Sequence, residues 1–160
     1  MAKSKQPDFP KIFPEDHWNR PPLRDRGDAT ADLTYGAVGM AITQWEMLED
    51  AVADLFAVLV QGQYSIAQRV YGAITTSHVR REALRNAAEI VFRNIAASEE
   101  ERNTFAQLLD NFSRASARRD DIAHAIVMGF QLSREPNAPM EDLGCFLLPP
   151  RYNSERNHPL

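Results

Sequence analysis

The chain has 160 residues and a mass of 18.1 kDa, the size of one domain, and can bury roughly 70% of the surface that its unfolded form exposes. Apolar residues make up 44% and charged residues 25%, which excludes wholesale disorder. The sequence has no long apolar run and no signal sequence, so we expect a cytoplasmic protein without a membrane segment. A net charge of −4 disfavours non-specific adhesion to nucleic acid, and one cysteine with four scattered histidines predicts no disulfide, metal or other cofactor.

Proline placement divides the chain into three parts. All ten prolines lie before Leu23 or after Glu135, and proline breaks helix interiors. We therefore predict an extended proline-rich arm at residues 1–30, a helical bundle at 31–130 and an irregular tail with a short extended segment at 131–160. Because the tail shows no evident final element, a fragment of a larger protein is a further interpretation.

Apolar residues recur at helical spacing in the middle part. From about residue 32, one stripe runs from Val38 to Leu59 at spacings of three and four. A second stripe lies beside it and consists of Met40, Met47, Ala51 and Val58. Two stripes give this helix two faces to bury, which is a first indication of oligomerisation.

Further helices are expected at about 64–74 and 78–96, and serine and glutamate form a capping box at Ser98 and Glu101 that begins a long final helix. The final helix carries its apolar stripe from Phe105 to Ile126, and the helical period fades beyond Met128. The prediction is an all-α antiparallel bundle of about four to five helices.

One charged residue occupies a core position of the last helix. Arg119 lies in the apolar stripe, so it must be paired, lie where the bundle opens, or face a partner subunit. Asp120 and His124 are four residues apart on one helix face, so the carboxylate can orient the imidazole. Arg119 and His124 are about 140° apart around an ideal helix and meet at one substrate only if the helix loosens or a second copy contributes.

The motif Arg119-Asp120-x-x-x-His124, late in a bundle whose first helix carries Trp45-x-x-Leu48-Glu49, resembles the HEPN superfamily. Members are small α-helical bundles, commonly dimers, and many are metal-independent ribonucleases of toxin–antitoxin, phage-defence and CRISPR-associated systems. The resemblance covers roughly residues 32–130. Relatives often have glycine after the histidine, where this chain has alanine.

The resemblance implies an endoribonuclease whose cleft is shared by two copies of the chain. RNA carries its own nucleophile, the ribose 2′-hydroxyl, and needs no metal for attack on the adjacent phosphate. The family motif would make His124 the proton-transfer group, Arg119 the phosphate clamp and Asp120 the residue that orients the imidazole. Arg118 is a candidate second phosphate contact, and Glu49 is a candidate acid or arginine partner at the same cleft.

A second hypothesis is a non-catalytic, dimeric helical interaction module that binds another protein or a nucleotide. In it, the Arg-Arg-Asp-Asp run is a surface ion-pair cluster, and His124 is favoured by the helix dipole. The net acidity favours this module, whereas the charge at a core position favours the ribonuclease. The expected partners are RNA, a second copy, and an antitoxin or other protein. His78, beside Arg80 and Arg81, is interpreted as a residue of a helix cap.

Overall fold

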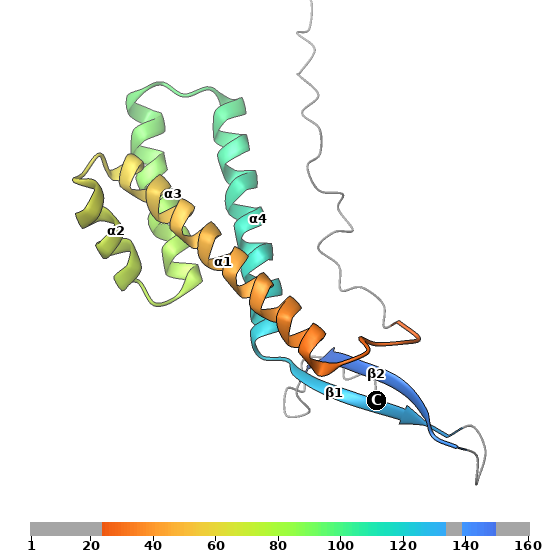
Figure 1. Cartoon of the computed structure of the whole chain (residues 1–160). Helices are drawn as coiled ribbons and strands as arrows, with labels where there is room; N and C mark the ends of the chain where they lie inside the picture. Colours follow the sequence, from red (N-terminus) through yellow and green to blue (C-terminus); the bar gives the residue numbers. More distant parts are fainter. Residues whose placement is uncertain (1–23, 134–138, 150–160) are drawn as a thin grey trace, which may run out of the picture.

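The computed structural model of the chain describes residues 24–133 and 139–149 (Figure 1). The elements in chain order are α1 (Ala31–Val60), α2 (Tyr64–Ala73), α3 (Ser77–Asn94), α4 (Glu99–Ala123), β1 (Ile126–Leu132) and β2 (Glu141–Leu148). The described part is mostly helical, as predicted, but it is not purely α because the two strands form an antiparallel sheet. Most of the predicted arm, residues 1–23, and the end of the tail, residues 150–160, lie outside the described residues.

The long helix α1 is the element against which the others pack. It contacts α2, α3 and α4, and the two strands lie at its N-terminal end (Figure 1). No helix in the described ranges combines the length and apolar character that a membrane span requires. The bundle and the sheet therefore share one helix as their common support.

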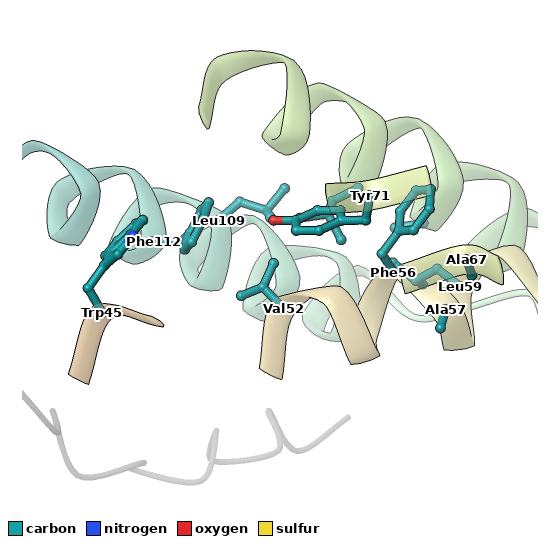
Figure 2. Close-up of a cluster of buried hydrophobic side chains, with 11 residues drawn as sticks. Trp45, Val52, Phe56, Ala57, Leu59, Ala67, Tyr71, Leu109 and Phe112 are labelled. Atoms are coloured by element: carbon teal, nitrogen blue, oxygen red, sulfur yellow. The ribbon is translucent and has the colours of Figure 1, made fainter. Parts of the chain in front are cut away.

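Part of the predicted core stripe of α1 is buried in one cluster: Trp45, Val52 and Leu59 are buried, whereas Leu48 is exposed. Figure 2 shows Trp45 and Phe112 at one end of the cluster, where their rings stack with centroids 5.4 Å apart, and Phe56 nearer the other end. The buried members are Trp45, Val52, Phe56, Ala57, Leu59, Ala67, Tyr71, Leu84, Ala88, Leu109 and Phe112. Helix spacing of three and four residues places one side chain per turn against α3 and α4, which explains why the stripe could be recognised.

Side chains cap the starts of α3 and α4. The Thr76 side chain accepts a hydrogen bond from the Val79 backbone N–H at 3.3 Å and begins α3. At the start of α4, Ser98 Oγ accepts from the Glu101 N–H, and the Glu101 carboxylate accepts from the Ser98 N–H at 2.7 Å. The capping box is thus confirmed, and the acidic first turn of α4 lies at the positive end of the helix.

The last helix is shorter than its apolar pattern predicts. We expected the helix to continue past Ile126, but α4 ends at Ala123 with His124 as its C-cap. Residues from Ile126 onward instead pair with β2, where Ile126 lies opposite Leu148. Branched Ile126 and Val127 suit a strand, and the pairing partner lies about twenty residues further on, so a local helical pattern could not reveal it.

Residues 27–28 of the predicted arm join the sheet. Asp28 and Cys145 exchange two backbone hydrogen bonds of 2.8 Å each. A side chain at Gly27 would overlap the Cys145 carbonyl, and Gly144 adopts a φ of 86°, so glycine is required at both positions of this crossing. The chain before α1 is thereby fixed to the hairpin that follows α4.

We predict that Ser98→Ala lowers the free energy of unfolding by about 1 kcal/mol, because it removes the cap of α4. Backbone and side-chain hydrogen bonds from Ser98 hold the pKa of Glu101 below its ordinary value. The stabilisation that depends on ionised Glu101 is therefore complete above the unfolded-state pKa and is lost as the pH falls through the lower folded-state pKa.

Denaturant unfolding from neutral pH to about pH 3 checks this dependence. The difference between the native chain and Ser98→Ala should be largest at neutral pH and smaller in acid. Glu100→Gln is the control, because Glu100 lies in the same turn but does not take the box position. A difference that stays constant across the range would show that the carboxylate contributes nothing to the cap.

Candidate functional site

Arg119 lies near the C-terminal end of α4, on the face that packs against α1. Its guanidinium carbon is 5.3 Å from the centroid of the Trp45 ring, and its Nη1 donates to Asp120 Oδ1 at 2.9 Å. Its side chain is 35% exposed, so the guanidinium is only partly desolvated. The core position is thus satisfied in two of the predicted ways: the arginine is paired, and it lies at the open end of the bundle.

His124 is one turn beyond Asp120 and follows the last helical residue. The imidazole belongs to an exposed residue, and the backbone N–H of His124 donates to the Asp120 carbonyl at 3.1 Å. Asp120 and His124 lie about 40° apart around α4, whereas Arg119 and His124 lie about 140° apart. The structure therefore keeps the angular separation that the sequence predicts, and α4 remains helical through Arg119.

Arg118 lies on a different side of α4 from His124. It forms an ion pair of 3.1 Å with Asp121, three residues further on. Together with the pair formed by Arg119 and Asp120, this contact makes the Arg-Arg-Asp-Asp run two neighbouring ion pairs. Partly exposed pairs of this kind contribute little to stability.

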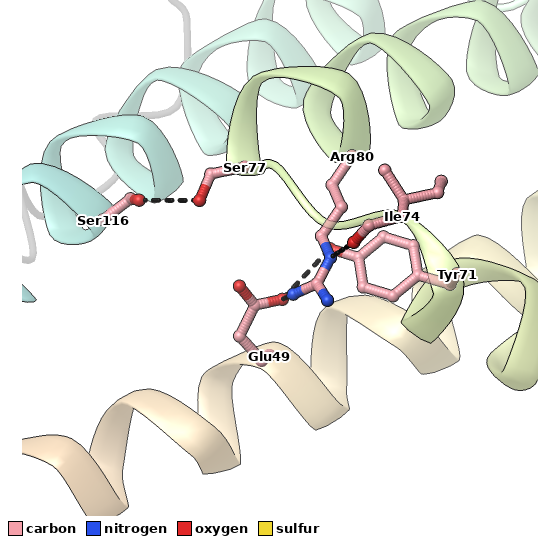
Figure 3. A network of polar contacts seen from close by, with 6 residues as sticks. All are labelled: Glu49, Tyr71, Ile74, Ser77, Arg80 and Ser116. Carbon is pink, nitrogen blue, oxygen red and sulfur yellow. Dashed lines mark hydrogen bonds and ion pairs between the residues drawn. The ribbon is translucent and has the colours of Figure 1, made fainter.

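Glu49 lies apart from these residues in a buried polar network. Its carboxylate forms an ion pair of 2.9 Å with Arg80 and accepts a hydrogen bond of 3.3 Å from the Tyr71 hydroxyl (Figure 3). Arg80 also donates to the Ile74 carbonyl at 2.8 Å and lies over the Tyr71 ring. Burial and the Glu49 charge raise the pKa of Tyr71 above its ordinary value, so the phenol stays a neutral donor.

This network ties α1 to the segment between α2 and α3. Glu49 is 8% exposed, and its partners are Tyr71 of α2 and Arg80 of α3. Arg80 in turn binds the connection between these helices at Ile74. Of the two roles expected for Glu49, an acid or an arginine partner, the structure shows the second, and the arginine is Arg80. The cavity beside it, about 430 Å³ in volume, is lined by residues of α1, α2 and the start of α3.

A second cavity, of about 200 Å³, lies between the first turn of α3 and the C-terminal part of α4. We call it the α3–α4 pocket. It is lined by Ser77, His78, Arg81, Phe112, Ser113, Ser116, Ala117 and Asp120. Figure 3 shows Ser116 and Ser77 side by side at this place, with a distance of 3.1 Å between their hydroxyl oxygens.

The α3–α4 pocket contains polar residues that the sequence did not identify as functional. His78 was interpreted as part of a helix cap, and Arg81 was noted only as its neighbour. Their sequence signal is a polar cluster at a helix start, which is also the ordinary appearance of a cap. Of the predicted site residues, Asp120 is the one that lines this pocket.

We predict that Glu49→Ala lowers the free energy of unfolding by about 3 kcal/mol, since it leaves Arg80 without its buried counter-charge. Glu46→Ala is the matched control on the same helix: Glu46 is exposed, and its loss should change stability by less than about 0.5 kcal/mol. Urea unfolding measures both. A Glu49→Ala protein of native stability and reduced activity would instead indicate a substrate contact.

The chemically active groups thus occur in two arrangements at one end of the bundle. Arg119 covers Trp45 on the α1 side, and the α3–α4 pocket brings His78 and Arg81 towards Asp120. In the described residues, no group of three His, Cys, Asp or Glu side chains is placed to hold a metal ion. Comparisons with protein-family models, with curated proteins and with solved structures found no match for this chain.

Proposed function

We propose that the protein is a metal-independent endoribonuclease of the HEPN type, with Arg119, Asp120 and His124 as its catalytic group. The observation that carries this proposal is the end of α4, where a partly exposed guanidinium is held over an indole ring and an exposed imidazole follows within two turns. In this proposal the protein acts in the cytoplasm as a homodimer, in toxin–antitoxin or phage defence, under the control of an antitoxin or other protein.

The reaction needs only groups that this chain can supply. The 2′-oxygen of RNA forms a bond to the adjacent phosphorus while the bond from phosphorus to the 5′-oxygen breaks. His124 accepts the proton of the 2′-hydroxyl, and an imidazolium supplies a proton to the leaving 5′-oxygen. Arg119 offsets the negative charge that develops on the phosphate. The products carry a 2′,3′-cyclic phosphate and a 5′-hydroxyl.

The environment of Arg119 supports the role of a phosphate clamp. The Trp45 ring and Asp120 restrict the guanidinium, so less side-chain entropy is lost when a phosphate binds. A guanidinium has five N–H donors, and its contact with Asp120 engages Nη1. The separation of about 140° between Arg119 and His124 requires that a second copy complete the cleft.

The test is cleavage of total RNA by purified protein in the presence of EDTA. We expect cleavage to persist with EDTA and to fall at least about a hundredfold in Arg119→Ala and in His124→Ala, since each removes a group that acts in the transition state. End-group analysis should detect the cyclic phosphate and the 5′-hydroxyl.

Arg114→Ala is the matched control for this experiment. Arg114 is an exposed arginine of the same helix, and its removal changes the net charge by the same amount as Arg119→Ala. It should leave the cleavage rate unchanged. Full cleavage by His124→Ala, or no cleavage by the native chain, would exclude the assignment.

A second candidate function, a dimeric helical interaction module, is favoured by one surface of α1. Four apolar side chains of this helix are exposed by 60% or more of their area and follow each other at spacings of seven, seven and eleven residues. They are Leu33, Met40, Met47 and Val58, and we call this surface the α1 seam. Spacing by sevens is typical of helices that pair with another helix.

The α1 seam points away from the bundle. Its residues lie about 200–240° around α1 from Trp45, so they occupy the side of the helix opposite the Arg119 contact. A homodimer that buries the α1 seam would therefore separate the two Arg119 side chains by about 20 Å, the width of two helices. This dimer would serve an interaction module and would not form a shared cleft.

We predict that the double change Met40→Glu and Met47→Glu converts a dimer formed at the α1 seam into a monomer, because buried carboxylates oppose association. Light scattering during size-exclusion chromatography distinguishes 18.1 kDa from twice that mass. Tyr35→Glu is the control, because Tyr35 is 59% exposed on the same helix but lies off the seam.

The same variants separate the two functions. If the seam variant becomes a monomer and loses cleavage, the seam contributes to the catalytic dimer, which contradicts its assignment to an interaction module. If it becomes a monomer and keeps cleavage, the seam serves another role, and one copy suffices for the chemistry. A native chain that is itself a monomer at all concentrations would exclude both dimeric functions.

A further inference from the structure

The α3–α4 pocket lies on the same face of α4 as His124. Its wall on this helix includes Ser113, Ala117 and Asp120, and His124 continues this row one turn further. Asp120 and His124 differ by about 6 Å along the helix axis and by about 40° around it. Among the residues that line the pocket, the cation on this face of α4 is Arg81 of α3, whereas Arg119 faces α1.

Arg81 is held in the pocket wall by two side chains. Its Nη1 donates to Ser113 Oγ, and its Nη2 is 3.2 Å from His78 Nδ1. Its Nε is fully buried and has no hydrogen-bond partner among the described residues. Nη1 and Nη2 each carry two N–H groups and make one contact apiece here, so donors remain for an acceptor in the pocket.

The other lining groups also suit an anion. Ser77 and Ser116 contribute two hydroxyls that are 3.1 Å apart, and His78 lies in the first turn of α3. Backbone N–H groups and the helix dipole make the start of a helix favourable for negative charge. The Asp120 carboxylate opposes an anion, but its charge is offset by Arg119 at 2.9 Å.

We propose that the α3–α4 pocket binds a backbone phosphate of RNA other than the one that is cleaved, with Arg81 as its cation and His78, Ser77 and Ser116 as further contacts. Ser113, which Arg81 contacts, lies about 16 Å before His124 along α4. This inference rests on the proposed function for its ligand, RNA. The volume of about 200 Å³ corresponds to roughly six or seven waters, enough for a phosphate and part of its ribose. An RNA strand that extends from the pocket along α4 in the C-terminal direction would reach His124.

The test measures binding of a single-stranded RNA whose 2′-hydroxyls are methylated, so that it cannot be cleaved. Arg81→Gln should weaken binding by about tenfold, because one charge-assisted contact is lost. It should also make the negative slope of log affinity against log salt concentration shallower by about 0.7, the value for one phosphate on a single strand. A purely structural role of Arg81 would not change this slope.

Two further variants keep the test decisive. Arg93→Gln removes the same charge from an exposed position at the other end of α3 and should leave affinity and slope unchanged. His78→Ala changes an exposed residue, so it should fold even if Arg81→Gln does not, and we expect about threefold weaker binding from the loss of one neutral hydrogen bond. Equal losses in Arg81→Gln and Arg93→Gln, or unchanged binding in Arg81→Gln and His78→Ala, would overturn the proposal.

A second arm uses inorganic phosphate and distinguishes the source of the phosphate group. Phosphate that raises the melting temperature of the native chain but not of Arg81→Gln, together with no binding of the methylated RNA, would overturn RNA as the ligand. Failure of the proposed function is seen separately, as the absence of cleavage of unmodified RNA. Binding that depends on Arg81 without any cleavage would retain the pocket and exclude the ribonuclease.

Discussion

The stacking of Trp45 on Phe112 determines how α4 is oriented against α1, and the candidate site follows from that orientation. The two rings are nearly parallel, with an interplanar angle of 19°, and both side chains are buried. Arg119 lies two turns beyond Phe112 on the same face of α4, so its guanidinium must meet the indole. His124 is consequently directed to a different side, and no rotation of α4 could bring both groups to α1 without removing Phe112 from the core.

Residue spacing was sufficient to predict the helices but not the sheet. Apolar side chains at intervals of three and four predict α1, and the Ser98 and Glu101 pair predicts the start of α4, because both signals act within one or two turns. The strand pairing between Ile126 and Leu148 depends on residues 22 positions apart, and its register has no local signature. The apolar pattern of α4 therefore extended the expected helix into residues that form β1.

The sequence likewise predicted only those features of the candidate site that depend on local residue spacing. Arg119 was identified because a charge at a core position conflicts with the helical pattern, and the structure resolves that conflict with Trp45 and Asp120. Glu49 produced no such conflict, and its partner Arg80 is 31 residues away, so its burial could not be inferred. Arg81 was missed for a related reason: its contact with Ser113 joins two helices whose relative placement the sequence does not specify.

The position of the second cation bears on how many copies of the chain the chemistry needs. If Arg119 alone holds phosphate, an angle of about 140° separates it from His124, and a partner subunit must supply the missing half of the cleft. Arg81 lies on the His124 side of α4, so in the proposed binding mode one copy would hold an RNA strand that extends towards its own imidazole. Dimerisation would then add Arg119 of a second copy to the reacting phosphate, where charge develops, while strand binding stays within one chain. Separate cations for binding and for the transition state would let substrate affinity and turnover respond to different residues.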